Sequence, residues 1–335
     1  MQFETPHDTS SSSAEIERAA SEIRELQKSC IATVSQVVVG LDKVVEQLMI
    51  ALIAGGHVLM EGVPGTAKTT LCKTFATLLG TEFQRIQFTP DLLPSDVTGT
   101  YIFDRQKNVF ELRKGPIFTN VLLADELNRA PAKTQSSLLE AMQESQVTIE
   151  GNTFELPQPF VVLATQNPVE QEGVYRLPEA QLDRFLLRVE VGYPNRADEV
   201  GMLDLHSAPV GSVDAITTTK NIQTLRSCIP KIHASQEIRE YIVDLARASR
   251  NHPEILLGAS PRASLYLMHA ARSHAIVHGR TFITHQDIHS VIEPVLGHRL
   301  ILQPEAEIEG RLATDVIQDL INLVPVNART SRDAR

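Results

Sequence analysis

The sequence predicts an α/β fold with a mostly parallel sheet and two inserted β-hairpins, followed by a separate all-helical domain. Three observations predict this arrangement. Short apolar segments alternate with helical periodicity between residues 58 and 165, which is typical of βαβ units. Two stretches of alternating polarity around a turn interrupt that pattern. Beyond Pro194-Asn195 the periodicity is almost only helical.

The first 195 residues carry the signals for a tail and for the α/β domain. Residues 1–13 end in a serine run and predict a flexible tail, so the domain is expected to span 14–195. Hairpins are expected at 101–118 and at 146–154, the second with Gly151-Asn152 at its turn. The expected helices are 14–29, 42–54, 68–79 and 132–144, and the expected strands are 58–60, 85–88, 121–124 and 160–165.

Residues 196–335 are expected to form the helical domain, with the domain boundary near 193–196. Apolar residues recur there at the spacing of amphipathic helices. The expected helices are 197–206, 235–249, 261–277, 285–296 and 308–323.

Length, charge and cysteine usage narrow the class of protein. The 335 residues correspond to about two domains. A net charge of -10 and an aromatic content of 5% disfavour general binding to nucleic acid or to anionic membranes. Cys30, Cys72 and Cys228 are too widely spaced for a zinc motif, which favours a reducing compartment. The polar start and the lack of a long apolar run predict a cytoplasmic protein without membrane insertion.

The strongest chemical motif is G-V-P-G-T-A-K-T, Gly62 to Thr69, which follows a strand and opens a helix. In that context a glycine-rich turn lets backbone N–H groups approach phosphates at a helix N-terminus. Lys68 can then reach the β- and γ-phosphates, and the Thr69 hydroxyl can hold Mg²⁺. Ala67 stands where the general pattern has glycine, and we expect a helical backbone there that tolerates alanine. The alternative, a turn with a solvent-exposed lysine, does not account for the strand and helix flanks.

Asp125 and Glu126 follow the apolar residues Val121 to Ala124, at the carboxyl end of an expected strand. Ligands bind at that edge of open α/β sheets. Asp125 can hold the Mg²⁺ shell, and Glu126 can orient or deprotonate the attacking water. Alone, the pair fits a helix N-cap equally well, but together with the Gly62–Thr69 loop it favours a catalytic site.

Three further polar residues have both a functional and a plain structural interpretation. Asn167 follows the strand 160–165 and could position water, or could simply occupy a turn before Pro168. Arg184 could neutralise transition-state charge, although spacing alone favours a surface ion pair with a nearby carboxylate. Arg262 follows a Ser260 cap near a helix N-terminus, where an anionic ligand or a neighbouring carboxylate would balance its charge.

These motifs, in this order, resemble those of the AAA+ ATPases, and their wording is similar to the MoxR family. The resemblance covers about residues 30 to 300, and alanine before the lysine is usual in that family. The motifs that carry it are E-G-V-P-G-T-A-K-T, F-T-P-D-L-L-P-S-D-V-T-G, L-A-D-E-L-N-R-A-P-A-K-T-Q-S-S-L-L-E-A-M-Q-E, A-T-Q-N-P-V-E-Q-E-G, L-P-E-A-Q-L-D-R-F-L-L and G-A-S-P-R-A-S-L.

The resemblance implies an AAA+ P-loop NTPase core with a lid domain, and it assigns roles to residues. The hairpin at 101–118 matches the helix-2 insert, and the one at 146–154 matches the hairpin before sensor 1. Mg²⁺ would be held by Thr69 and, through water, by Asp125. The nucleotide-binding residues would be Val39 and Gly40 near the adenine, the Walker A residues Gly62, Val63, Pro64, Gly65, Thr66, Ala67, Lys68, Thr69 and Thr70, and Asp125 of Walker B.

The catalytic residues implied by the resemblance are Glu126 of Walker B, Asn167 as sensor 1, Arg184 as arginine finger and Arg262 as sensor 2. Arg129 is a second candidate for action on a neighbouring subunit. The implied function is Mg²⁺-dependent ATP hydrolysis in a hexameric ring that remodels or activates protein clients, often with a von Willebrand factor A domain partner. Alternatives are a nucleotide-gated scaffold with little turnover, a DNA-directed motor, and a magnesium-chelatase-like subunit.

Overall fold

The computed structural model describes the backbone of residues 7–166, 175, 177–205 and 213–326, and the side chains of 14–166, 175, 177–203 and 213–326. Contacts between Cα atoms divide the chain into two compact units. The sheet unit is Glu25–Arg226, and the helical unit combines Met1–Arg24 with Ser227–Arg335. Each unit is described by itself below.

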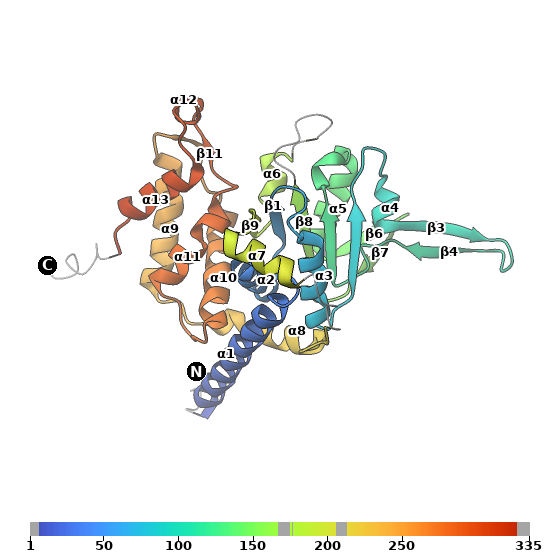
Figure 1. Cartoon of the computed structure of the whole chain (residues 1–335), viewed down its shortest axis with the longest axis horizontal. Coiled ribbons are helices and arrows are strands. Elements are labelled where there is room, and N and C mark those ends of the chain that lie inside the picture. The colour runs from blue at the N-terminus through green and yellow to red at the C-terminus, as the bar shows by residue number, and fades with distance from the viewer. Residues whose placement is uncertain (1–6, 167–174, 176, 206–212, 327–335) are drawn as a thin grey trace, which may run out of the picture. The chain divides into compact units, whose positions relative to one another are not determined.

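The sheet unit is built on a five-stranded parallel sheet with the strand order β2-β5-β8-β1-β9 (Figure 1). The three central strands are apolar and buried on both faces, as parallel strands covered by helices require. All four expected strands are confirmed to within a few residues. The strands are β1 (Val58–Glu61), β2 (Phe83–Gln87), β5 (Val121–Asp125), β8 (Val161–Gln166) and β9 (Leu187–Glu190).

Helices surround this sheet and bury one continuous apolar cluster against it. Phe88, Leu122, Val162 and Phe185 of that cluster are completely buried. The expected helices 42–54 and 132–144 are confirmed with the same bounds. The helices of the sheet unit are α2 (Asp42–Ala54), α3 (Lys68–Leu78), α4 (Pro94–Thr98), α5 (Ala132–Glu144), α6 (Glu179–Leu182), α7 (Arg196–Leu205) and α8 (Thr219–Ser227), with a 3₁₀ turn η1 (Leu127–Arg129).

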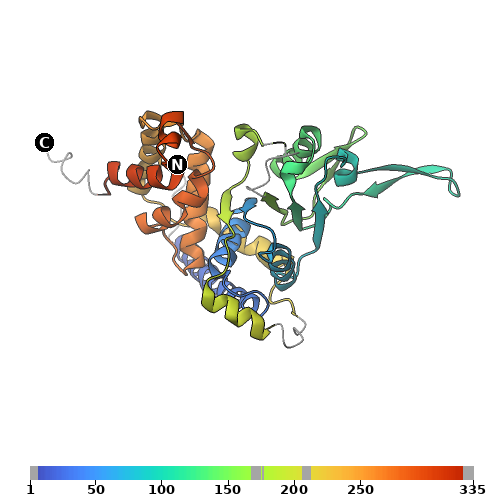
Figure 2. The same ribbon diagram turned by 45° about the horizontal axis from the view of Figure 1, so that its top comes forward.

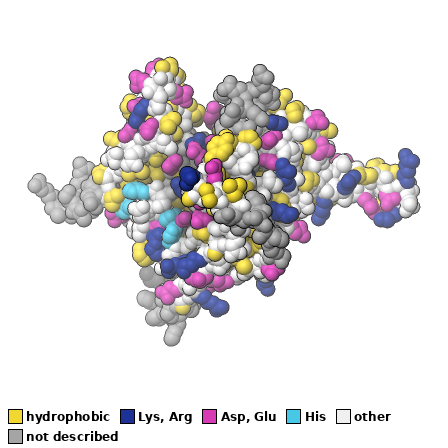
Figure 3. All heavy atoms as spheres, in the orientation of Figure 1, with side chains coloured by type: hydrophobic (Ala, Val, Ile, Leu, Met, Phe, Trp, Pro, Cys, Tyr) yellow, Lys and Arg dark blue, Asp and Glu magenta, His cyan; other side chains and the backbone are white. Residues whose placement is uncertain are grey.

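Both expected hairpins are present in the sheet unit. β3 (Gly99–Asp104) pairs with β4 (Val109–Lys114), and β6 (Gln146–Ile149) pairs with β7 (Asn152–Glu155). The β3–β4 hairpin projects away from the parallel sheet in both ribbon views (Figures 1 and 2). Figure 3 shows basic side chains along it, and Phe103 and Phe110 form a ring pair with centroids 5.2 Å apart. Phe110 is 69% exposed, so this hairpin carries apolar surface outside the core.

The helical unit packs its long helices around a small antiparallel strand pair. α10 and α11 are confirmed with the expected bounds, and the buried Asp287 of α11 accepts hydrogen bonds from His274 and Arg280. The elements of this unit are α9 (Gln236–Asn251), α10 (Pro261–Val277), α11 (His285–Leu296), α12 (Pro304–Ile308), α13 (Ala313–Leu323), the strands β10 (Ile255–Leu257) and β11 (Ile301–Leu302), and a 3₁₀ turn η2 (Ile229–Lys231).

The unit boundary lies at Arg226/Ser227, which corrects the expected division into 14–195 and 196–335. Helix α7 belongs to the sheet unit. Its N-terminus is capped by Asn195, whose Oδ1 accepts from the backbone N of Ala197 and Asp198 at 2.9 and 3.0 Å. The Asp198 carboxylate lies so close to Gly40 that a Cβ there would be 2.5 Å from its Oδ2. Pro194-Asn195 therefore starts a helix inside the sheet unit rather than a linker.

Two other expectations at the chain ends differ from the structure. Helix α1 (His7–Val34) begins at His7, inside the expected flexible tail 1–13, because serine costs a helix only about 0.5 kcal/mol per residue relative to alanine. The expected helix 308–323 is interrupted between α12 and α13, where Gly310 adopts a φ of +80°.

The cysteines and the membrane question can be settled for the described residues. Cys30, Cys72 and Cys228 are buried free thiols. Burial raises the pKa of the Cys30 thiol to about 12 and raises that of Cys72 further. Within the described part of the chain, no helix is long and apolar enough to cross a membrane.

Candidate active site

The loop between β1 and α3 folds into a tight turn with two left-handed residues. Gly65 has a φ of +84° and Ala67, the N-cap of α3, has a φ of +56°. Successive backbone N–H groups in such a turn converge and form an anion-binding concavity. A Cβ added at Gly65 would meet no atom within 4 Å, so the turn is open above this glycine. The loop therefore fits the approach of a phosphate group.

Ala67 corrects one detail of the sequence analysis. Its backbone is left-handed rather than ordinary helical, a conformation that costs a non-glycine residue about 1–2 kcal/mol. Strain of this kind persists where the surrounding structure over-determines the backbone. Gly62, by contrast, requires glycine, because a Cβ there would lie 2.2 Å from the carbonyl oxygen of Val191.

Lys68 places its ammonium group inside the loop. Its Nζ donates hydrogen bonds to the carbonyl oxygens of Gly62 and Val63, each at 2.7 Å. Burial lowers the pKa of Lys68, whereas the negative charges of Asp125 and Glu126 act in the opposite direction. The lysine expected to contact phosphate thus lies in the electrostatic field of both expected Walker B carboxylates.

The carboxylate of Asp125 is held on both of its oxygens at the carboxyl end of β5. Thr165 of β8 donates its hydroxyl to Asp125 Oδ1 at 2.5 Å. Arg85 of β2 donates to Asp125 Oδ2 through Nη2 at 2.6 Å and through Nε at 3.1 Å. The flanking strands therefore fix the orientation of this carboxylate.

Glu126 follows in a left-handed conformation with a φ of +55°. Its backbone N donates to Thr165 Oγ1 at 2.8 Å, so one hydroxyl orients two consecutive acidic residues. Arg129 Nε lies 3.0 Å from Glu126 Oε2 as an ion pair. This contact lacks hydrogen-bond alignment, and the buried Oε2 accepts no hydrogen bond from the described residues. A water molecule is the smallest group that would satisfy such an oxygen.

The backbone after Glu126 is fixed by a buried side chain. Gln135 of α5 is 1% exposed and donates through Nε2 to the carbonyl oxygens of Leu127, Ala130 and Tyr175. The N–H of Tyr175 also donates to Asn128 O at 2.7 Å. These bonds tie the η1 turn to the chain near residue 175 and hold the left-handed turn at Glu126 in place.

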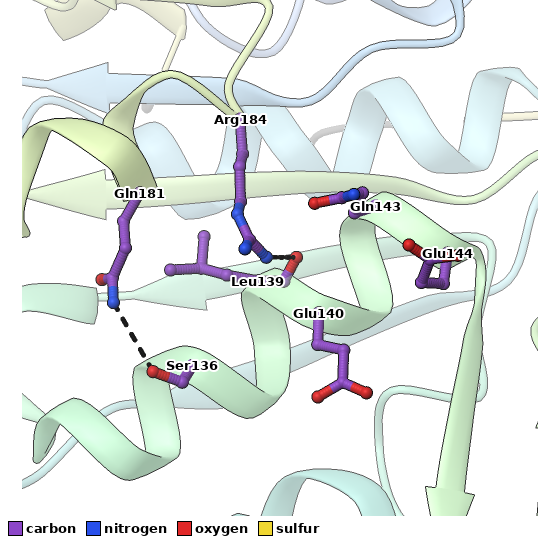
Figure 4. Close-up of a pocket in the computed structure, with 7 residues that line it drawn as sticks. All are labelled: Ser136, Leu139, Glu140, Gln143, Glu144, Gln181 and Arg184. Carbon is purple, nitrogen blue, oxygen red and sulfur yellow. Dashed lines mark hydrogen bonds between the residues drawn. The ribbon is translucent and has the colours of Figure 1, made fainter.

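Arg184 lies in a pocket of about 380 Å³ on the surface of the sheet unit. Figure 4 shows its guanidinium extending over α5, where Nη1 donates to the carbonyl oxygen of Leu139 at 2.7 Å. The Gln181 amide lies beside it and donates to Ser136 at 3.5 Å. The pocket wall also includes Glu140, Gln143 and Glu144, so Arg184 is surrounded by polar and acidic groups.

The remaining expected site residues are distributed as follows. The turn with Val39 and Gly40 lies beside α7, where Gly40 has a φ of +79° and approaches Asp198. Thr69 and Thr70 open α3, and the Thr70 side chain is exposed. Arg262 belongs to the helical unit, in the first turn of α10, whose expected Ser260 cap is confirmed by a bond from Ala263 N at 3.2 Å. Asn167 lies outside the described residues.

Two residues of this site were not identified from the sequence, Arg85 and Thr165. Both lie at the carboxyl ends of strands that flank β5, so the strand order brings them to Asp125. The available signal was their position near strand ends, where functional groups of parallel sheets gather.

The arrangement provides the groups that phosphoryl transfer to water requires. A left-handed turn and an ammonium group face a phosphate site, while hydroxyl and carboxylate oxygens suit Mg²⁺. A second carboxylate lies beside them as an acceptor for the proton of a water molecule. The residues of the loop and of the β5 end thus fit a nucleotide with its magnesium ion.

Comparison with protein families points in the same direction. Residues 57–187 match the family described as the ATPase family associated with various cellular activities (AAA). Residues 247–320 match the AAA lid domain. The first match contains the loop, both carboxylates and Arg184, and the second lies inside the helical unit and contains Arg262.

Individual relatives match nearly the whole chain. Chaperone MoxR1 of Mycobacterium tuberculosis is 43% identical, over 93% of this chain and 86% of that protein. The uncharacterized protein YeaC of Bacillus subtilis is also 43% identical, over 92% of this chain and 98% of its own length. A crystal structure of a candidate ATPase from Cytophaga hutchinsonii is 42% identical, with a TM-score of 0.86 over 92% of this chain and 97% of that one.

Proposed function

The chain belongs to the MoxR family of AAA+ ATPases, and from this premise we propose that it hydrolyses ATP in a Mg²⁺-dependent reaction and uses the energy to remodel or activate protein clients. The AAA+ core and lid expected from the sequence are confirmed. The observation that carries the proposal is the placement of Glu126 and Asp125 at the end of β5, close enough to Lys68 to oppose the fall in its pKa.

Nucleotide binding is assigned to the loop and the start of α3. The N–H groups of the turn at Gly65 and Ala67 would surround the phosphates, and Lys68 would exchange its bonds to loop carbonyls for bonds to phosphate oxygens. Thr69 and, through water, Asp125 would hold Mg²⁺, which supplies charge neutralisation to the phosphates when it is bound. The Val39–Gly40 turn is assigned to the adenine end of the nucleotide.

Hydrolysis is assigned to Glu126. Its buried Oε2 is free of hydrogen bonds from the described residues and can accept the proton of the attacking water. Thr165 fixes the peptide that carries Glu126, so this oxygen is held at one place. Asn167 is assigned to the positioning of the same water, as its place after β8 in the sequence suggests.

We assign the shared chemistry to a ring of identical subunits, with six as the number implied by the family. Arg184 lies on the surface of the sheet unit with polar neighbours, a setting that allows its guanidinium to extend to a nucleotide on an adjacent subunit. Arg262 at the start of α10 is assigned to sensing the nucleotide from the lid.

Client contact is assigned to the β3–β4 hairpin. It carries apolar side chains in solvent, of which Phe110 is 69% exposed, together with the basic residues Arg105, Lys107, Arg113 and Lys114. One relative is named a chaperone, which supports a protein as the client. A von Willebrand factor A domain protein is our proposed partner, on the strength of the family resemblance.

The proposal is tested by steady-state ATP hydrolysis measured against protein concentration, with Glu126→Gln as the matched variant. Specific activity should rise cooperatively with concentration, because each site needs two subunits. The variant should bind ATP with unchanged affinity and lose at least about a hundredfold in turnover. Turnover that is independent of Glu126 would remove this residue from the mechanism, and activity independent of concentration would argue against shared sites.

A nucleotide-gated scaffold is the second candidate, and one observation favours it. The ion pair between Arg129 and Glu126 occupies the carboxylate that hydrolysis needs. If this pair persists in the assembled protein, ATP would be bound and retained with little turnover. The same assay separates the two functions, since a scaffold would assemble on ATP yet show a flat background of hydrolysis in both proteins.

A further inference from the structure

Arg85 is a cation placed directly on the carboxylate assigned to magnesium. β2 and β5 are neighbours in the sheet, with Gln87 opposite Asp125 and Arg85 opposite Leu123. Arg85 extends along β5 to Asp125 and makes two hydrogen bonds to Oδ2, at 2.6 and 3.1 Å. The same Nη2 donates to Gln87 Oε1 at 2.8 Å, so a second acceptor on β2 supports the guanidinium.

Both oxygens of Asp125 are engaged in this arrangement. Thr165 takes Oδ1 and Arg85 takes Oδ2, and the Asp125 side chain is only 14% exposed. A divalent cation held through Asp125 would therefore either share Oδ2 with a guanidinium or displace it. In both cases the two positive groups repel each other at short range, where the partly buried setting weakens solvent screening.

Arg85 is able to leave without unfolding its surroundings. Its side chain is 46% exposed, and Gln87 provides an acceptor that remains when the bond to Asp125 breaks. An exposed arginine can exchange a carboxylate for water at modest cost, typically below about 1 kcal/mol for a pair of this kind.

We propose that Arg85 is a positioning residue that competes with Mg²⁺ for Asp125 and so sets the metal concentration at which the nucleotide site fills. With little metal present, Arg85 keeps Asp125 aligned against Thr165. When metal binds with the nucleotide, Arg85 transfers its hydrogen bonds to Gln87 and to solvent. The inference rests on the proposed ATP site and adds a control of its metal occupancy.

The test uses Mn²⁺ as the metal probe in the full-length chain. Mn²⁺ affinity is measured by electron paramagnetic resonance at saturating ATP, in a Glu126→Gln background that prevents turnover. Adding Arg85→Gln should tighten Mn²⁺ binding by about threefold to tenfold, because one competing charge is gone. ATP affinity in EDTA should change by less than about twofold. Arg85→Lys, which keeps the charge without the two-pronged contact, should fall between the two.

The matched control is Arg113→Gln, an equal loss of charge on the β3–β4 hairpin, which should leave Mn²⁺ affinity unchanged. Melting temperatures of the apoproteins show that the variants remain folded. Intact ATP binding with unchanged or weaker Mn²⁺ affinity in the Arg85 variants would overturn this inference alone. A background protein that binds no ATP would overturn the proposed function and, with it, the role of Arg85.

Discussion

Arg129 Nε lies 3.0 Å from Oε2 of Glu126, three residues earlier in the same chain. Arg129 was one of two candidates for an arginine that acts on a neighbouring subunit. Here its charge is directed to the general base of its own site instead. The pair joins the residue that would accept a proton to a cation that holds its oxygen in an ionic contact.

Removing this contact should raise turnover. Both side chains are roughly one-third exposed, so the pair is worth at most about 1 kcal/mol, which corresponds to about a fivefold change in rate. We expect Arg129→Ala to increase kcat by up to about that factor at saturating ATP and protein. Lys133→Ala, an exposed charge removed from the following helix, serves as the control. A marked fall in kcat for Arg129→Ala would return Arg129 to the list of trans-acting residues.

Thr165 should prove essential to the site although it touches no phosphate. Thr165→Val keeps the side-chain volume but leaves Asp125 Oδ1 and the Glu126 N–H without their partner, a loss of about 1–3 kcal/mol. We expect kcat to fall at least about tenfold, with ATP affinity affected less. Thr165→Ser restores the hydroxyl and should recover most of the rate. Equal activity in the Val and Ser variants would show that the hydroxyl does not align the carboxylates.

Mixing two inactive variants tests whether Arg184 acts between subunits. Lys68→Ala lacks the phosphate-binding lysine, and Arg184→Ala keeps it but lacks the arginine. In random mixed rings at equal proportions, about a quarter of the interfaces combine an intact Lys68 with an intact Arg184. Turnover should therefore return to about a quarter of the wild-type value. Failure to recover activity at every mixing ratio would place Arg184 in its own subunit's chemistry or in structure alone.

His57 should make the sheet unit sensitive to acid. Burial lowers its pKa from the usual 6.5 to about 4, and the neutral ring is satisfied on both nitrogens. Nε2 donates to Met142 O at 2.9 Å, and Nδ1 accepts from Val162 N at 3.0 Å. Protons therefore bind the unfolded chain first as the pH falls below 6.5. Full stability is present above that pH and is lost progressively toward pH 4.

The expected loss by pH 5 is about 2 kcal/mol, or about 4–8 °C in melting temperature for a unit of this size. His57→Gln keeps one donor and one acceptor without a titrating group, so its melting temperature should fall less between pH 7.5 and pH 5. Comparing the two proteins cancels the contribution of the other histidines. Parallel melting curves at both pH values would show that the buried ring is not the acid-sensitive group.

Local signals predicted the elements that frame the site. β1, β5 and β8 are runs of buried apolar residues, and α3 begins at Lys68 as its glycine-rich approach indicated. β9 was not predicted, because four residues directly after the short α6 show too little periodicity for a strand. The unit boundary was also misplaced, since the Pro-Asn signal at 194–195 is common to linkers and to helix N-caps.

The chemistry of single residues was predictable where a motif states it, and the cooperation between residues was not. Lys68, Asp125 and Glu126 were identified by their spacing and flanks. The contacts of Arg85 and Thr165 with Asp125 depend on the strand order, which places β2 and β8 on either side of β5. The left-handed backbone at Ala67 is imposed by the loop around it and leaves no trace in residue type.

The burial of all three cysteines has a practical consequence for studying this protein. Thiols that are buried, with a raised pKa at Cys30 and Cys72, react slowly with maleimides and similar reagents at neutral pH. A single cysteine introduced at the exposed tip of the β3–β4 hairpin, as in Gln106→Cys, would then be the one position that takes up a fluorophore or crosslinker quickly. The natural chain can therefore be labelled site-specifically without first replacing its own cysteines.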